Sequence, residues 1–180
     1  MKTNKEEVTL ENNVVFKGKV VTLHNDKVKC PNGVEATREF VEHNGGVCIL
    51  CEIDNKIAFV KQYRYAYKQE VIELPAGKLE KGEDPYNAGI RELEEEIGYK
   101  AKSLTDYGIM YPSVGYSNEI IHMYVANEVT KTKTNFDFDE NLDLVFLSKE
   151  EIESLLETNE IKDAKTIILL NKYMSRKGEK

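Results

Sequence analysis

One acidic segment constrains this chain more than any other part of its sequence. From Gly77 to Glu83 it reads Gly-Lys-Leu-Glu-Lys-Gly-Glu, and from Arg91 to Gly98 it reads Arg-Glu-Leu-Glu-Glu-Glu-Ile-Gly. Carboxylate oxygens are the ligands that hard divalent cations prefer, and such cations assist catalysis by binding phosphate oxygens. The fixed offsets of these acids therefore indicate a catalytic site that holds divalent cations beside a phosphate.

The second part of the segment predicts a helix over residues 85–97. Asp84 suits the N-cap, Pro85 suits the first helical position, and Gly98 can end the helix in a left-handed conformation. At about 100° per residue, the apolar side chains between these ends form one narrow stripe, which we expect to pack on a core. They are Tyr86, Ile90, Leu93 and Ile97.

Three glutamates, Glu92, Glu95 and Glu96, fall within an arc of roughly 100° on the side of this helix away from the stripe. Like charges three or four residues apart destabilise a helix by ~0.2–0.5 kcal/mol per pair, and by more when partly desolvated, unless a cation neutralises them. A solvated acidic helix face is the alternative explanation. The nearby Arg91 favours the metal site, because it can pair with Glu83 or Glu95 and orient the carboxylates.

Taken together, eight positions of this segment resemble the signature box of the Nudix hydrolases, with one soft departure at Tyr99, where that family usually has an aliphatic residue. The matching positions are Gly77, Glu83, Arg91, Glu92, Leu93, Glu95, Glu96 and Gly98. The resemblance implies an α+β fold, an α/β/α sandwich with a mixed β-sheet between helices. It also implies hydrolysis, dependent on Mg²⁺ or Mn²⁺, of a nucleoside diphosphate linked to another group.

Segments outside the box are similar to the ADP-ribose pyrophosphatase branch of the family. They are 16–20, 31–33, 36–43, 62–64, 73–77 and 160–166. The resemblance implies hydrolysis of a small nucleotide sugar, ADP-ribose, to AMP and ribose 5-phosphate by water attack at phosphorus. It also implies a homodimer: residues 1–43 form an N-terminal antiparallel β extension that exchanges strands with a partner, and residues 44–180 form the Nudix hydrolase domain.

The same resemblance assigns metal ligands. It places two or three Mg²⁺ ions, or Mn²⁺, on the carbonyl oxygen of Ala76 and on the carboxylates of Glu92, Glu96 and Glu140. Oxygen ligands of this kind suit hard cations. Catalytic roles fall to Glu95, which is a ligand or orients water, to Arg91, and to Glu140 and Asp139 in the acidic stretch 135–140.

Substrate contacts are expected from four residues. Arg64 fits a direct contact with the substrate, and Arg38 could contribute across the dimer, although each could equally be an arginine on a strand surface. Glu119 is expected to bind substrate or metal, and Glu73, in the stretch 73–77, is placed with this group by the resemblance.

Two departures from the branch limit the assignment of substrate and base. Where the branch usually has a proline in the loop over the ribose end, this chain has Val114, and a proline stands at Pro112 instead. Proline restricts the backbone, so this loop could differ in shape. Phe138 occupies the usual position of the general base. One of the neighbouring aspartates, Asp137 or Asp139, or the box residue Glu95 must then accept the proton. The alternative for the two aspartates is that they lie in a solvated turn.

Composition sets further limits. A chain of 180 residues, 41% of them hydrophobic, can bury a full core as one domain. The formal net charge of −7 argues against binding nucleic acid, whose affinity depends on lysine and arginine. No apolar stretch approaches about eighteen residues, and the first residues lack the apolar run of a signal peptide, so we expect no membrane association and a cytoplasmic location.

Cys48 and Cys51 have the spacing of half a zinc site, but only Cys30 remains elsewhere, which favours buried strand cysteines.

Alternation and turn residues predict the other elements. Strands are expected at 14–24, 34–41, 46–53, 56–63, 71–74, 104–110, 119–126 and 142–147, with turns at 31–33 and 54–55 and helices from Ser148 to Leu156 and from Asp163 to Tyr173.

Two other functions are weighed against ADP-ribose hydrolysis. The first keeps the chemistry but changes the substrate to other nucleoside diphosphate sugars or to a nucleoside triphosphate, and the altered loop at Val114 supports it. The second is a non-catalytic ADP-ribose sensor. Sensors of this fold tend to lose box glutamates or to carry a DNA-binding domain, and this sequence has neither feature.

Overall fold

The computed structural model describes residues 5–134 and 142–177. The chain divides into two compact units, Met1–Gly45 with Tyr111–Ile120, and Gly46–Met110 with Ile121–Lys180. The segment Tyr111–Ile120 was not expected to join the N-terminal residues. The role of residues 1–43 in dimerisation stays a prediction.

The first unit is an antiparallel sheet built around β3 (Thr22–Lys29), which pairs with β1 (Val8–Glu11), β2 (Val14–Lys17) and β4 (Glu35–Glu42). The prediction of one strand over 14–24 is wrong, because the Gly18 N–H donates to the Val21 carbonyl (2.8 Å) and turns the chain between β2 and β3. The predicted turn at 31–33 is confirmed, with Gly33 at φ 86°.

The second unit contains a mixed sheet in the order β10 (Tyr99–Met110), β11 (Ile121–Lys131), β5 (Gly46–Leu50) and β9 (Ala76–Lys78). Strands β5 and β11 run parallel, and the other pairs are antiparallel. A further sheet is formed around β7 (Lys56–Arg64), which pairs with β6 (Glu52–Ile53), β8 (Gln69–Glu73) and β12 (Leu142–Leu147).

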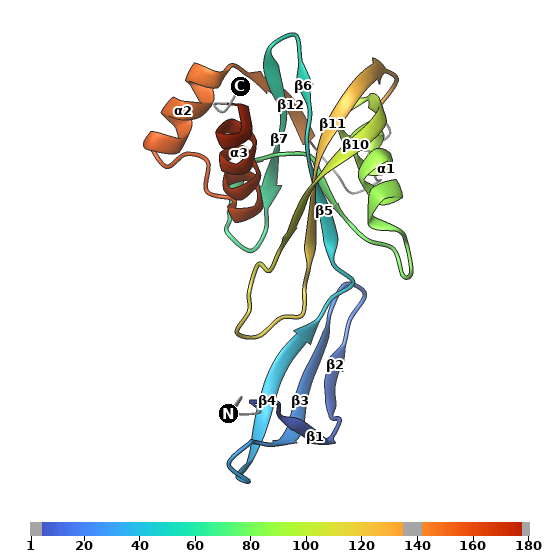
Figure 1. Ribbon diagram of the computed structural model, residues 1–180, viewed down its shortest axis with the longest axis vertical. Helices are drawn as coiled ribbons and strands as arrows, with labels where there is room; N and C mark the ends of the chain where they lie inside the picture. Colours follow the sequence, from blue (N-terminus) through green and yellow to red (C-terminus); the bar gives the residue numbers. More distant parts are fainter. Residues whose placement is uncertain (1–4, 135–141, 178–180) are drawn as a thin grey trace. The chain divides into compact units, whose positions relative to one another are not determined.

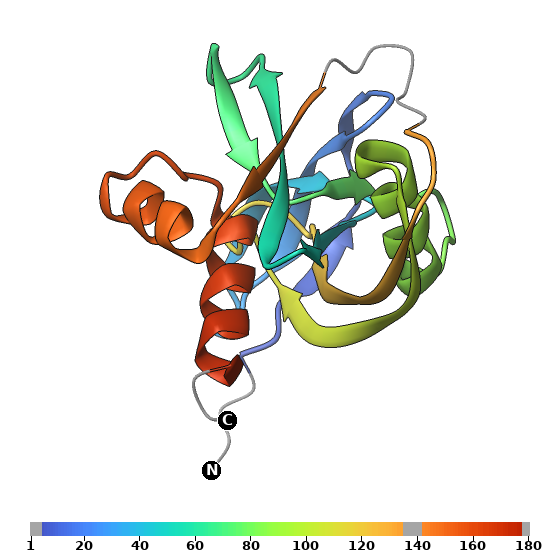
Figure 2. The ribbon, with the colours of Figure 1, turned by 90° about the horizontal axis from the view of Figure 1, so that it is seen from above.

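Helices cover these sheets on both sides. Figures 1 and 2 show α1 (Pro85–Ile97) on one side of the strands, with α2 (Lys149–Glu157) and α3 (Ala164–Lys177) on the other. The predicted α/β/α sandwich is confirmed. None of the helices in the described residues has the length and apolar composition needed to cross a membrane.

The sequence of β5 explains the sandwich, because all five of its residues are buried. Val47 and Ile49 belong to an apolar cluster with Leu93 and Ile97 of α1. Cys48 and Leu50, on the opposite face, belong to a second cluster that includes residues of α2 and α3. A strand covered on both faces needs a continuous apolar run, which is what 46–50 provides.

Helix α1 has the predicted ends. Asp84 caps it and accepts the Asn87 N–H (3.1 Å), and Gly98 is left-handed at φ 69°. Its buried face is wider than the predicted stripe. It takes in Ala88 and Gly89, and an added Cβ on Gly89 would lie 2.8 Å from Leu104 Cδ1. Glu96 also lies on this face at 2% exposure, so the prediction that all three glutamates face away from the core is wrong for this residue.

Other element boundaries differ modestly. The turn at Asp54–Asn55 is confirmed, both residues having positive φ, but the strand before it breaks at Cys51. Strands β10 and β11 extend to Tyr99 and Lys131, beyond their predicted ends, and β1 and β9 were not predicted. The capping box of Ser148 and Glu151 at the start of α2 is confirmed.

In the described residues no disulfide and no cluster of three metal-binding side chains includes a cysteine. Cys48 and Cys51 are free and buried, as predicted, and burial raises the pKa of both thiols, that of Cys51 to about 12. Cys30 is free and partly exposed.

Candidate active site

The contact between Gly77 and Glu92 brings the two halves of the acidic segment together. Gly77 lies on β9, opposite Val47 of β5. A Cβ on Gly77 would lie 1.8 Å from the Glu92 carboxyl carbon and about as close to both of its oxygens. Only glycine therefore lets this carboxylate reach the strand.

Glu96 contacts the same strand through the backbone. Its carboxylate accepts the Ala76 N–H (2.9 Å) from a position that is almost fully buried. Ala76 is the residue whose carbonyl oxygen was predicted to bind metal. The sequence placed Glu96 and Ala76 in one site, and the structure adds a direct hydrogen bond between them.

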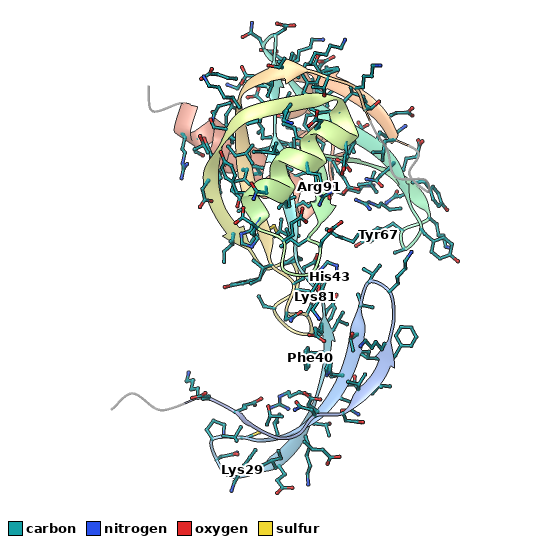
Figure 3. The ribbon with its side chains drawn as sticks, turned by 90° about the vertical axis from the view of Figure 1, so that its right-hand side faces the viewer. Lys29, Phe40, His43, Tyr67, Lys81 and Arg91 are labelled. Atoms are coloured by element: carbon teal, nitrogen blue, oxygen red, sulfur yellow. The ribbon has the colours of Figure 1, made fainter. Side chains whose placement is uncertain are left out.

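Arg91, labelled on α1 in Figure 3, binds three carboxylates of the box. Its guanidinium donates to both oxygens of Glu83 (2.9 and 3.0 Å), and its Nη1 donates to Glu92 (2.9 Å) and Glu95 (2.8 Å). The predicted pairing with Glu83 or Glu95 thus involves both, with Glu92 added. The hydrogen bonds from Arg91 hold the pKa of Glu83 below its usual value, and donating these same hydrogen bonds to Glu83 raises the pKa of Arg91.

These residues fit a hard divalent cation. Their donor atoms are all oxygens, and the pairing of three carboxylates with one guanidinium leaves the site negatively charged. Within the described residues no three acidic, histidine or cysteine side chains converge in the geometry of a closed metal cluster. The reason is visible in the contacts: Arg91 holds Glu92 and Glu95, while Glu96 binds the Ala76 N–H.

Glu73 is a buried anchor in this structure. Both of its oxygens accept from the guanidinium of Arg64 (2.6 Å each), and Lys165 donates a further hydrogen bond (2.5 Å). Burial by itself would raise the pKa of Glu73, but Arg64 and Lys165 outweigh burial and hold it below its usual value. Glu73 therefore orients Arg64, and the predicted substrate contacts of both residues stay predictions.

Lys165 and Thr166 lie beside Glu73 and Leu74, which the sequence does not predict. Lys165 also pairs with Asp163 (3.0 Å), and the Thr166 hydroxyl accepts the Leu74 N–H (2.9 Å). In the sequence, the segment 160–166 is marked only by its likeness to the branch. A lysine in the first turn of a helix gives no local signal that it will pair with a buried carboxylate far away in the sequence.

Arg38 and Glu119 both lie in the first unit. Arg38 is bound by Glu7 and also donates to the Thr37 carbonyl (2.9 Å). Glu119 lies 3.4 Å from His43 Nδ1, in a segment joined to β4 by the Val41 N–H, which donates to the Tyr116 carbonyl (2.7 Å). The predicted roles of these two residues stay predictions.

The acidic stretch lies outside the described residues. This concerns Glu140 and Asp139, the alternative general base Asp137, and Phe138 at the usual position of the base. Their predicted roles therefore stay predictions.

Comparison with known proteins agrees with this geometry. The sequence matches the NUDIX domain family over residues 42–170. The chain belongs to the Nudix family.

Curated relatives of this Nudix protein cover most of its length. An ADP-ribose pyrophosphatase from Bacillus subtilis is 43% identical over 164 residues, which is 89% of each chain. A methanol dehydrogenase activator from Bacillus methanolicus is 41% identical and covers 91% of this chain and 90% of its own. A GDP-mannose pyrophosphatase from Escherichia coli is 26% identical, with 92% of this chain and 94% of the relative covered.

A crystal structure described as an ADP compounds hydrolase has the same fold. Its TM-score is 0.86 at 22% identity, over 99% of this chain and 98% of that one. The predicted identity as a Nudix pyrophosphohydrolase related to the ADP-ribose pyrophosphatases is confirmed.

The contact at Gly77 yields a prediction. In Gly77→Ala the new methyl group must displace the Glu92 carboxylate, and because that group is the end of a flexible side chain, the fold should be retained. We expect Mn²⁺ affinity, measured by electron paramagnetic resonance titration, to fall roughly 10–100-fold, as it does when the surroundings of metal ligands are disturbed. Gly115→Ala, which meets nothing within 4 Å, is the control. Unchanged Mn²⁺ affinity in Gly77→Ala would remove Glu92 from the ligand set.

Proposed function

We propose that this Nudix protein hydrolyses the pyrophosphate bond of ADP-ribose to give AMP and ribose 5-phosphate. The observation that carries the proposal is the set of box carboxylates that Arg91 and Gly77 hold against β9. The choice of ADP-ribose is supported by the 43% identity to the pyrophosphatase from Bacillus subtilis over 89% of the chain.

The site is proposed to use Mg²⁺, or Mn²⁺, with two or three ions bound. Glu92, Glu96 and the Ala76 carbonyl would hold them, together with Glu140. When bound, divalent cations would neutralise charge on the pyrophosphate oxygens and lower the pKa of a bound water.

The residues of the chain would then position the substrate and move one proton. Water attacks one phosphorus, the bond from that phosphorus to the bridging oxygen breaks, and a carboxylate accepts the proton of the water. Glu95, which Arg91 orients, and the predicted pair Asp139 and Glu140 are the proposed acceptors. Arg91 itself keeps the carboxylates in place during this step.

Arg64 is the proposed contact with the pyrophosphate. The Nε and Nη2 atoms of Arg64 donate to Glu73. In the described part of the chain Arg64 Nη1 makes no hydrogen bond. The side chain is 40% exposed, so this edge can donate to a phosphate oxygen. Arg38 and Glu119 are proposed as further substrate contacts.

Substrate preference tests the proposal. We expect ADP-ribose to give the highest kcat/KM, or to share it, in a set that includes other nucleotide sugars and nucleoside triphosphates, and EDTA to abolish turnover. Products are identified by chromatography against AMP and ribose 5-phosphate. If ADP-ribose ranks low while another compound is hydrolysed, the substrate proposal fails and the Nudix chemistry stands. Binding without any hydrolysis would indicate the sensor.

A second candidate substrate is another nucleoside diphosphate sugar. Val114 is 83% exposed in the loop where the branch usually has proline, and the Escherichia coli relative is named a GDP-mannose pyrophosphatase. A higher kcat/KM for GDP-mannose than for ADP-ribose would favour this candidate.

The chain is also proposed to form a homodimer through its N-terminal strands. Strands β1 and β2 expose several large apolar side chains. Monomeric proteins rarely expose contiguous apolar surface of this kind. The exposed side chains are Val8, Leu10, Val14, Val15 and Phe16.

Light scattering after gel filtration tests the dimer. We expect a mass about twice the 20.6 kDa of the chain. Replacing Val15 and Phe16 together by aspartate should give monomers, because buried unpaired charges are costly at an apolar contact. Tyr65→Asp, at an exposed position in the second unit, should leave the mass unchanged. A monomeric unmodified protein would contradict the dimer.

A further inference from the structure

A network of charges centred on the buried Glu73 joins three elements of the second unit. Arg64 ends β7, Glu73 ends β8, and Lys165 lies in the first turn of α3. Glu73 is 3% exposed and accepts hydrogen bonds from both cations, while Lys165 pairs in addition with Asp163. Two positive and two negative groups therefore balance one another in this network.

The network lies beside the box. Arg64 interacts electrostatically with Glu96. Three charges of the network, Lys165, Asp163 and Glu73, act together with Glu96 on the buried thiol of Cys48, whose strand pairs with β9 at Ala76. The Leu74 N–H is bound by Thr166, the residue after Lys165. The start of α3 thus holds the strand end that leads into the predicted metal site.

Lys165 affects the net charge that a ligand meets near Arg64. Oxygen Oε2 of Glu73 accepts from Arg64 Nη2 (2.6 Å) and from Lys165 Nζ (2.5 Å), so the two cations share one carboxylate. Without Lys165, Arg64 would be the one side chain among the described residues that donates to Glu73, and the network would gain a net negative charge. Such a charge, partly shielded from water, repels phosphate more strongly than one on the surface.

We infer that Lys165 is a positioning residue for the substrate: through Glu73 it keeps Arg64 oriented and electrostatically available to a nucleoside diphosphate. This inference rests on the proposed function, because it assumes that Arg64 meets the pyrophosphate. Burial alone would lower the pKa of Lys165, but Glu73 and Asp163 outweigh burial and raise it, so the lysine stays charged.

The test compares Lys165→Met with Lys165→Arg and with Lys172→Met. Lys172 lies on the same helix and donates to the Tyr107 carbonyl (2.9 Å), away from Glu73, so it controls for loss of a helix cation. We expect Lys165→Met to raise KM for ADP-ribose about tenfold with kcat changed by less than about threefold, because a charge beside the phosphate-binding arginine is lost. Lys165→Arg should restore most of the affinity, and Lys172→Met should match the unmodified protein.

A double-mutant cycle separates positioning from general loss of structure. In an Arg64→Ala background, Lys165→Met should raise KM by less than about twofold, since its effect acts through the arginine. Equal effects of Lys165→Met in both backgrounds, or a loss confined to kcat, would overturn the inference. If Lys165→Met does not fold, Lys165→Gln removes the charge while keeping a hydrogen-bond donor, and the same outcomes apply to it.

A binding measurement tests the role of Lys165 independently of the proposed reaction. Calorimetric titration of ADP-ribose in EDTA measures Kd without turnover, and Lys165→Met should weaken it about tenfold, as for KM. If the unmodified protein binds ADP-ribose without hydrolysing it, the proposed reaction fails while this titration still decides the role of Lys165. If it hydrolyses ADP-ribose and Lys165→Met behaves like Lys172→Met, the reaction stands and the inference fails.

Discussion

The arrangement of the site depends on one guanidinium that binds three carboxylates. Arg91 holds Glu83 from the turn before α1, and Glu92 and Glu95 from the helix itself. Without it, acids at three- and four-residue spacing would repel one another on a partly buried surface. The arginine offsets only part of their charge, and the remainder is what a divalent cation neutralises. One side chain therefore makes the acidic helix stable and leaves it attractive to metal.

The strand beside this helix is held from both sides of the sandwich. On one side Glu96 binds the Ala76 N–H, and the missing side chain of Gly77 lets Glu92 approach. On the other side Thr166 binds the Leu74 N–H, and Lys165 completes the charges around Glu73. The Ile49 N–H donates to the Pro75 carbonyl (2.8 Å) between them. The short segment 73–77 is thus fixed by hydrogen bonds from α1, α3 and β5, as a precise metal or phosphate site requires.

Local features were predictable from the sequence. The N-cap at Asp84, the left-handed Gly98 and the capping box at Ser148 each depend on neighbouring residues, and all three are present. Burial and pairing were less predictable, because they depend on contacts across the chain. Glu96 is buried together with Ala88 and Gly89, and Glu73 binds Lys165, which lies 92 residues away in the sequence.

Glu96→Gln tests the central claim that the box carboxylates act through a divalent cation. Glutamine keeps an oxygen that can accept the Ala76 N–H, so the fold and its melting temperature should change little while one negative charge is lost. We expect kcat for ADP-ribose with saturating Mg²⁺ to fall at least ~10²-fold, because charge stabilisation by metal supplies several kcal/mol. Near-normal turnover in a folded Glu96→Gln protein would contradict the account.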